Sequence, residues 1–237
     1  MNFDMYYKII NEDFSGKVKV KSIHKNEVMP YLFDYIDLTN IKEQTHSIVK
    51  VSVGGQLKLL DLRSGNLLEY TINKWNLDGT ERFITMTLQN GACAVYDCIA
   101  KKMRILPKNI CRTFVSTYYE DNYILVQLQS GEYTFYHLSR YFILDVRYSK
   151  EDIQKLGGKL HWKDVIKRSP KDFEHLPMKL ANNKSVINQC VEIFNEILKE
   201  KKKVLRKEDY LNYKKNIVEI YNKRVGHLYN NKQSEKA

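Results

Sequence analysis

The stretch FITMTLQNGACAVYDCIAKKM, residues 83–103, is followed forty positions later by a similar stretch, YILVQLQSGEYTFYHLSRYFI, residues 123–143. The two align without a gap and share five residues: Ile84/Ile124, Leu88/Leu128, Gln89/Gln129, Gly91/Gly131 and Tyr96/Tyr136. In each copy an alternating run meets Gln-Asn-Gly or Gln-Ser-Gly, and a second alternating run follows. Asn-Gly between alternating runs predicts a β-hairpin, because both residues tolerate positive φ. The segments that follow, CIAKKM and LSRYFI, predict short helical turns, so we expect a duplicated hairpin–helix unit.

The residues before the repeat also alternate. MYYKII (5–10) and KVKVKSI (17–23) predict two strands, and SIVKVSV (47–53) predicts another that ends at Gly54-Gly55. The stretch GQLKLLDLRSGNLLEY (55–70) predicts a hairpin with Ser-Gly-Asn at its turn. For residues 28–38 we expect a short helix that begins near Pro30.

After Asp145 the sequence pattern changes from one typical of strands to one typical of helices. We expect a short helix capped by Ser149 and ended by Gly157-Gly158, and another short helical piece from Ser169-Pro170 to Pro177. In residues 185–206, apolar side chains recur at three-and-four spacing behind Ser185 as the cap, which predicts a long helix. A second stripe over residues 208–225 predicts a helical hairpin, 185–225, closed by Gly226.

Charge is distributed unevenly. The chain has 39 Lys and Arg against 28 Asp and Glu, a net charge of +11. Residues 1–145 hold 17 against 16 of these, and the remaining residues hold 22 against 12. A basic module joined to a neutral one predicts that the basic part faces a polyanion.

These patterns define a fold class and its parts. We expect an α+β protein: a β-rich domain with antiparallel sheet over residues 1–146, containing the repeat, and a basic α-helical module over 147–237. An apolar fraction of 43% suffices for a packed core. No run approaches the roughly eighteen apolar residues that cross a bilayer, so we expect no membrane association. Without an export signal, we expect a cytoplasmic protein. Abundant Lys, Asn, Ile and Tyr favour an AT-rich source such as a low-GC bacterium or its phage, in which case the location is the host cytoplasm.

The period of about forty residues is similar to that of WD-type propellers. We set that architecture aside, because a closed propeller needs at least four blades and residues 47–143 supply at most three units.

Residues 47–143 instead resemble the N-terminal modules of phage-type HNH homing endonucleases. VSVGGQLKLLDLRSGNLL (51–68) resembles their Gly-marked strand and turn, and DGTERFITMTLQNGACAVYDCIAKK (78–102) resembles the hairpin that follows. DNYILVQLQSGEYTFYHLSRYF (121–142) resembles it again, with His137 where the family has a His-Arg-Leu segment. The resemblance implies DNA binding and, if the catalytic motif is present, metal-dependent cleavage.

The catalytic motif of that family is not found. No Asp-His pair follows His137, Asn182-Asn183 precedes a helix cap, and Asn230-Asn231 lies in the tail. The first copy of the repeat has Asp97 where the second has His137. We therefore expect either a polar residue that satisfies a helix end at this position or, in the nuclease alternative, a catalytic base. No P-loop, zinc or paired-carboxylate motif appears, so we predict no metal or other cofactor.

The strongest electrostatic feature is the run KEKKKVLRK, residues 199–207. It has a structural interpretation, since cations near a helix C-terminus are favoured by the macrodipole. Its functional interpretation is contact with phosphates, supported by further cations at Lys163, Lys167, Arg168, Lys171, Lys223 and Arg224. We select as nucleic-acid-binding residues Lys201, Lys202, Lys203, Arg206, Lys207, Lys214 and Lys215. Six tyrosines would stack bases if exposed and otherwise pack a sheet: Tyr118, Tyr119, Tyr123, Tyr133, Tyr136 and Tyr141.

The function predicted from these residues is that of a non-catalytic nucleic-acid-binding regulator or accessory protein, phage-encoded or bacterial, acting on DNA or RNA. Two alternatives stay open. One is a divergent HNH-like endonuclease with His137 as base. The other is a protein-interaction factor that uses the tyrosine-rich sheet to inhibit a host enzyme, with a host or phage protein as partner.

Overall fold

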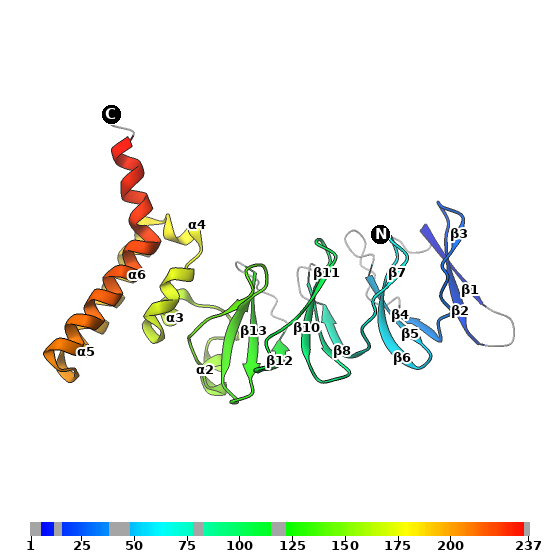
Figure 1. Cartoon of the computed structure of the whole chain (residues 1–237), viewed down its shortest axis with the longest axis horizontal. Helices are drawn as coiled ribbons and strands as arrows, with labels where there is room; N and C mark the ends of the chain where they lie inside the picture. The colour runs from blue at the N-terminus through cyan, green and yellow to red at the C-terminus, as the bar shows by residue number, and fades with distance from the viewer. Residues whose placement is uncertain (1–5, 12–15, 38–47, 78–82, 115–121, 235–237) are drawn as a thin grey trace. The chain divides into compact units, whose positions relative to one another are not determined.

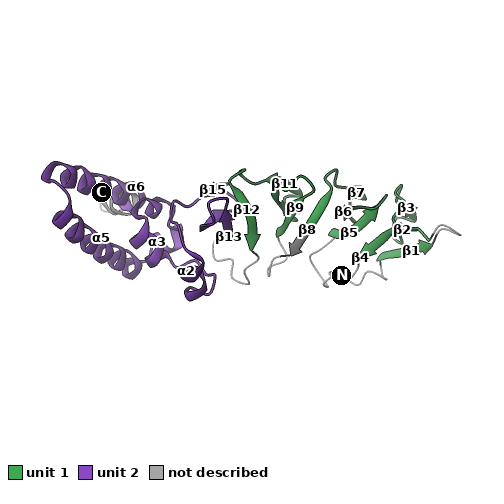
Figure 2. Cartoon of the chain, turned by 90° about the horizontal axis from the view of Figure 1, so that it is seen from below, with its two compact units in different colours: residues 1–117 green, residues 118–237 purple. Residues whose placement is uncertain are grey.

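The computed structural model describes residues 6–11, 16–37, 48–77, 83–114 and 122–234. Its contacts divide the chain into two compact units, residues 1–117 and 118–237 (Figure 2). The sequence predicts a division at residue 146 instead. The boundary between the units falls inside the repeat, before its second copy, so that copy belongs to the same unit as the helices.

Unit 1 consists of antiparallel sheets, and within each sheet every strand pairs with the next along the chain (Figure 1). The first sheet has three strands, β1 (Tyr7–Asn11), β2 (Val18–Ser22) and β3 (Glu27–Val28). The second has four, β4 (Tyr35–Asp37), β5 (Ile48–Val53), β6 (Gln56–Asp61) and β7 (Asn66–Leu67). The third has β8 (Ile72–Leu77), β9 (Phe83–Leu88), β10 (Cys93–Asp97) and β11 (Lys102–Ile105), and β12 (Ile110–Phe114) follows it.

Both faces of the second sheet are buried, and this joins the three sheets into one unit. Successive side chains of a strand point to opposite faces. Val49, Val51 and Leu60 therefore face one way, and they pack with Tyr7, Val20 and Phe33 of the first sheet region. The alternate residues Ile48 and Leu59 pack with a cluster from the third sheet, namely Ile72, Ile84, Met86, Leu88, Ala94 and Tyr96. The alternation in the sequence thus encodes two apolar interfaces rather than one apolar and one solvated face.

Unit 2 contains three strands and then helices. The strands are β13 (Tyr123–Leu128), β14 (Tyr133–His137) and β15 (Phe142–Ile143), and β14 pairs with both of the others. The helices are α2 (Lys150–Lys155), α3 (Trp162–Arg168), the 3₁₀ helix η2 (Pro170–His175), α4 (Met178–Ala181), α5 (Lys184–Val204) and α6 (Lys207–Ser234). The structure is thus α+β, with several antiparallel sheets and a C-terminal helical part.

The segments after each hairpin differ from the sequence prediction. Residues 98–101 and 138–141 form four-residue turns, and the chain then continues into strands β11 and β15. The expected helical turns are therefore wrong, as is the helix near Pro30, where the chain runs without helix into β4. The reason lies in the backbone: Lys101 and Tyr141 adopt positive φ, at 51° and 62°, which reverses the chain without a glycine.

One type of turn occurs four times among the described residues, whereas the sequence repeat indicates only two copies. The last residue of β2, β6, β10 and β14 is Ser22, Asp61, Asp97 and His137 respectively, and each side chain accepts hydrogen bonds from the turn that follows it. The fourth residue after each has positive φ, at Asn26, Gly65, Lys101 and Tyr141. Side chains that satisfy turn amides in this way stabilise the chain reversal before the short strand that follows, which is β3, β7, β11 or β15.

The expected start and stop signals of the first helices are confirmed. Ser149 caps α2 in a capping box with Asp152, and Gly157 and Gly158 follow the helix with positive φ. Pro170 begins η2, which ends before Pro177. The cap of α5 is Asn183 rather than Ser185, since the Asn183 side chain accepts from the amides of Ser185 and Val186. Gly226 does not close α6, which continues to Ser234.

One buried carboxylate ties the helices of unit 2 to the strand region. Asp172 of η2 is 1% exposed, and its two oxygens accept from the backbone amides of Asp145 and Val146 at 2.8 and 2.7 Å. Burial raises the pKa of Asp172, although the two amide donors act in the opposite direction. Because these amides have no ladder partner at that point, the carboxylate provides the acceptors that the strand end lacks.

Candidate nucleic-acid interface

The helix α5 is positioned by one apolar stripe. Ile187, Cys190, Phe194 and Ile197 are buried at three-and-four spacing, which places them on one side of the helix. Phe194 contacts Phe173 of η2 edge to face, with ring centroids 5.1 Å apart. The stripe ends at Ile197, so the last two turns of α5 extend beyond the buried core and are exposed from Lys199 to Val204.

The helix α6 packs on η2 rather than mainly on α5. Tyr221 stacks on Phe173 at 5.9 Å between centroids, and Lys223 forms an ion pair with Glu174 at 2.7 Å. The guanidinium of Arg224 donates to the carbonyl of Leu176. Ile217 and Val225 are buried on the same side. The first two turns of α6 therefore lie, like the end of α5, outside this packed region.

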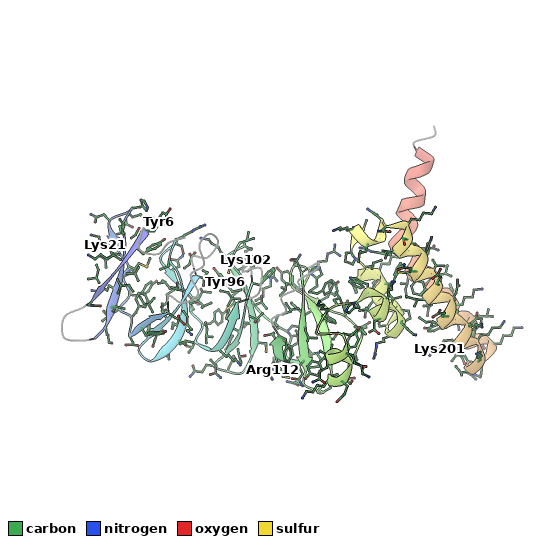
Figure 3. The ribbon with its side chains drawn as sticks, turned by 180° about the vertical axis from the view of Figure 1, so that it is seen from behind. Tyr6, Lys21, Tyr96, Lys102, Arg112 and Lys201 are labelled. Carbon is green, nitrogen blue, oxygen red and sulfur yellow. The ribbon has the colours of Figure 1, made fainter. Side chains whose placement is uncertain are left out.

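Five of the seven predicted phosphate-binding residues flank Leu205, which interrupts the helix at the junction of α5 and α6, and Lys214 and Lys215 lie about two turns further along α6. All seven are exposed: Lys201, Lys202, Lys203, Arg206, Lys207, Lys214 and Lys215. Figure 3 labels Lys201 near the end of α5. A cationic end suits the C-terminus of α5, where the macrodipole is negative.

Three of the seven have a partner that reduces their availability. Arg206 pairs with Asp209 at 2.8 Å, Lys215 lies 3.8 Å from Glu219, and the Lys201 ammonium lies 5.9 Å from the centroid of the Tyr213 ring. Both ion pairs are well exposed, and exposed pairs of this kind are worth only about 0–1 kcal/mol. They can exchange for a phosphate at small cost.

The other four lysines, Lys202, Lys203, Lys207 and Lys214, form no ion pair within the described parts of the chain. Lys207 and Lys214 share one flank of α6 with Leu211 and Val218, because positions 207, 211, 214 and 218 follow the helical repeat. Leu211 and Val218 are 54% and 46% exposed. This flank carries no carboxylate over those three turns of described helix, so its two charges are not neutralised locally.

Two of the four basic residues upstream are held by carboxylates. Arg168 is held by two carboxylates, Asp152 at 2.9 Å and Asp164 at 3.1 Å, and its guanidinium lies over the Tyr148 ring. Lys171 pairs with Asp145 at 2.7 Å. Lys163 and Lys167 are exposed on α3. Two of these four cations are therefore held by carboxylates, whereas Lys163 and Lys167 stay available in addition to the lysines at the α5–α6 junction.

His137 is the last residue of β14 and its side chain accepts from the turn that follows, as described above. His137 is 7% exposed. The centroid of its ring lies 4.6 Å from that of Tyr123 and 5.2 Å from that of Phe142. Its Nδ1 accepts from the amides of Ser139 and Arg140 at 3.2 and 3.0 Å. Burial, assisted by the nearby Arg140 charge, lowers the pKa of His137 to about 4. The ring is therefore neutral near pH 7, with one nitrogen occupied.

The six tyrosines differ in exposure, so packing of the sheet explains some of them and stacking on bases stays open for others. Tyr123 and Tyr136 are 3% exposed and belong to the core, whereas Tyr133 is half-buried and Tyr141 is 44% exposed. Tyr118 and Tyr119 lie outside the described residues. Packing of the sheet thus accounts for the two most buried rings.

The described residues hold neither a cluster of metal ligands nor a helix that could span a membrane. No group of three or more His, Cys, Asp or Glu side chains is placed to hold a metal ion within the described segments. No helix among those segments combines the length and apolarity needed to span a bilayer.

No protein-family model matches the chain, and no curated protein matches it. Among solved structures it is similar to the N-terminal domain of Nup159, with 10% identity and a TM-score of 0.32 over 63% of this chain and 43% of that one. It is also similar to a chain in the S. cerevisiae structure of a Dbp5 variant bound to Nup159, a Gle1 variant, IP6 and ADP, with 11% identity and a TM-score of 0.32 over 62% and 42%. The match spans less than half of those chains, and a likeness at this level carries no argument about function.

Proposed function

We propose that the chain is a non-catalytic nucleic-acid-binding protein, a regulator or accessory factor, that holds phosphates with the junction of α5 and α6. The observation that carries the proposal is the group of four exposed lysines without carboxylate partners, Lys202, Lys203, Lys207 and Lys214. The α5 macrodipole favours Lys202 and Lys203, but Lys207 and Lys214 of α6 have no such compensation. The mutual repulsion of the four charges opposes folding slightly, and an external anion would relieve it.

Two further features support phosphate contact over base recognition. Lysine binds phosphate as a flexible point charge and lacks the planar fork that arginine uses for bidentate base contacts. Six of the seven residues at the junction are lysines. We therefore expect binding that depends strongly on salt and weakly on sequence.

The absence of catalysis is part of the proposal and is supported by the geometry around His137. A general base must reach the proton it removes within about 2.6–3.2 Å. The His137 ring is buried among aromatic side chains, and its Nδ1 already accepts from two turn amides. The same position in the first copy, Asp97, also accepts from two turn amides, which favours a structural role for both.

A gel shift on DNA and RNA, at low and at physiological salt, tests the proposal. Charge reversal of the four lysines to glutamate should abolish the shift at both salt concentrations. A matched control reverses four exposed lysines elsewhere in the same unit: Lys150, Lys155, Lys179 and Lys184. The control should retain most of the wild-type affinity, and the absence of any shift by the wild-type chain would contradict the proposal.

A further inference from the structure

The first sheet has one buried face and one outer face. Tyr7 and Val20 are buried in the core cluster, and Ile9 and Val18 pack against it. The alternate residues of β1 and β2 must point the other way. They are Lys8, Ile10, Lys19 and Lys21, and Figure 3 labels Lys21 on β2.

The strand register brings the lysines of the outer face together. Lys8 is directly opposite Lys21, Ile10 is opposite Lys19, and Lys21 is opposite Val28 of β3 on its other side. Directly opposite residues have Cβ atoms about 4.5–5.5 Å apart, and residues two apart on one strand are separated by about 6.7 Å. Three ammonium groups therefore rise from a patch only two residues wide.

This arrangement is unfavourable for the isolated sheet. Like charges directly opposite each other on an antiparallel pair destabilise it. Neither Lys8 nor Lys21 forms an ion pair or side-chain hydrogen bond within the described residues. A repulsive pair that packing does not require is typical of a functional surface, where a local rule is broken to serve binding.

We propose that the outer face of the β1–β2–β3 sheet is a second nucleic-acid-binding surface, on which Lys8, Lys19 and Lys21 hold the sugar–phosphate backbone. The inference rests on the function proposed above and extends it from the helical junction in unit 2 to unit 1. A second copy of the chain that docked through the same face would bring like charges together.

The composition of the face favours nucleic acid over an acidic protein. The cores of protein–protein interfaces are depleted in lysine and enriched in aromatic residues and arginine. This face has three lysines, and its remaining outward residues are the aliphatic Ile10 and Val28. The outward residues of the described strands β1, β2 and β3 include no aromatic ring on which bases could stack, so these residues contact phosphates without reading sequence.

Fluorescence anisotropy with a labelled duplex and a labelled single strand, titrated over a series of salt concentrations, tests the inference. The double variant Lys8→Gln/Lys21→Gln removes two contacts from the outer face. The negative slope of log K against log salt should become less steep, by about 1.8 for the duplex and about 1.4 for the single strand, from about 0.9 and 0.7 for each phosphate. The variant Lys8→Arg/Lys21→Arg, which keeps both charges, should bind as the wild type does.

The control variant Lys74→Gln/Lys102→Gln removes the same charge from exposed positions on the third sheet, and its slope should not change. The melting temperature separates binding from folding, because Lys8→Gln/Lys21→Gln relieves a repulsion and should melt no lower than the wild type. A variant that melted lower and still bound with the wild-type slope would overturn the inference.

Other results would overturn the inference in distinguishable ways. If Lys8→Gln/Lys21→Gln keeps the wild-type slope while a Lys202→Gln/Lys203→Gln variant has a less steep slope, the proposed binding surface on the sheet is contradicted. The proposed binding by the α5–α6 junction is then supported. If the wild-type chain does not bind, both proposals fail together. An equal loss in the third-sheet control would show a net-charge effect only. Competition by poly-glutamate that is stronger than competition by unlabelled nucleic acid would assign the face to an acidic protein.

Discussion

The buried ring of His137 predicts a specific dependence of stability on pH. Its folded pKa is about 4, against an ordinary value of 6.5, because burial disfavours the charged ring. A histidine whose folded pKa is depressed contributes stability above its unfolded pKa and loses it as the pH falls from 6.5 toward 4. The two values differ by about 2.5, and each pKa unit corresponds to about 1.4 kcal/mol, so the full effect is roughly 3 kcal/mol. About 2 kcal/mol of it should be lost between pH 7 and pH 5.

The variant His137→Asn isolates this effect, because its side-chain oxygen can accept from the same two turn amides without titrating. We expect the variant to be less stable at pH 7 by about 1–2 kcal/mol, since it loses ring contacts with Tyr123 and Phe142. It should, however, lose about 2 kcal/mol less than the wild type between pH 7 and pH 5. Comparison of the two proteins cancels the titration of other groups, including His175, whose pKa burial also lowers.

Urea unfolding at both pH values, followed by Trp162 fluorescence, provides the measurement. Trp162 lies in unit 2 with its ring 5.6 Å from Tyr123, and a Trp75→Phe background removes the other tryptophan. Equal losses of stability by wild type and His137→Asn between pH 7 and pH 5 would refute the reasoning. That result would mean that the His137 ring carries a proton in the folded state or is not buried.

Three further predictions concern the contacts that hold each unit. Asp172→Ala leaves two buried amides without acceptors and should destabilise unit 2 by about 3 kcal/mol in urea unfolding; a loss below 1 kcal/mol would contradict the anchoring role. Asn183→Ala should cost about 1 kcal/mol, whereas Ser185→Ala should cost only a few tenths, and the reverse order would restore Ser185 as the cap of α5. Asp61→Ala should destabilise unit 1 by about 2–4 kcal/mol, because this buried carboxylate serves its own turn and pairs with Lys101 at 3.0 Å. Thermal melts that leave unit 1 unchanged would show that the turn does not need it.

The hairpins could be predicted from the sequence, but the segments that follow them could not. The dipeptides Asn-Gly and Ser-Gly indicate the hairpin turns, because glycine at those positions tolerates positive φ. In the next turn the residues with positive φ are Lys101 and Tyr141, which carry no turn signal. The strands after them have four and two residues, too short for any periodicity to appear. Asp97 and His137 occupy the same place in the repeat, and both accept from turn amides, so this position indicates the turn that the periodicity does not.

The candidate sites show a similar division. A run of lysines at a helix end predicts exposure, and all seven selected residues are exposed. Spacing could also have indicated the pair of Arg206 with Asp209, since residues three apart on a helix are neighbours. The position of Lys8 directly opposite Lys21 could not be predicted, because it depends on the register between β1 and β2. A shift of one residue would have turned one of the two lysines to the core.

The most direct test of the central claim is the salt dependence of nucleic-acid binding by the wild-type chain and by a variant with Lys202, Lys203, Lys207 and Lys214 changed to glutamine. If these four lysines each neutralise one phosphate of a duplex, the negative slope of log K against log salt should become less steep by about 3.6 in the variant. The matched variant at Lys150, Lys155, Lys179 and Lys184 should keep the wild-type slope. Wild-type binding that is insensitive to salt, or an unchanged slope in the four-lysine variant, would contradict the claim that the α5–α6 junction holds phosphates.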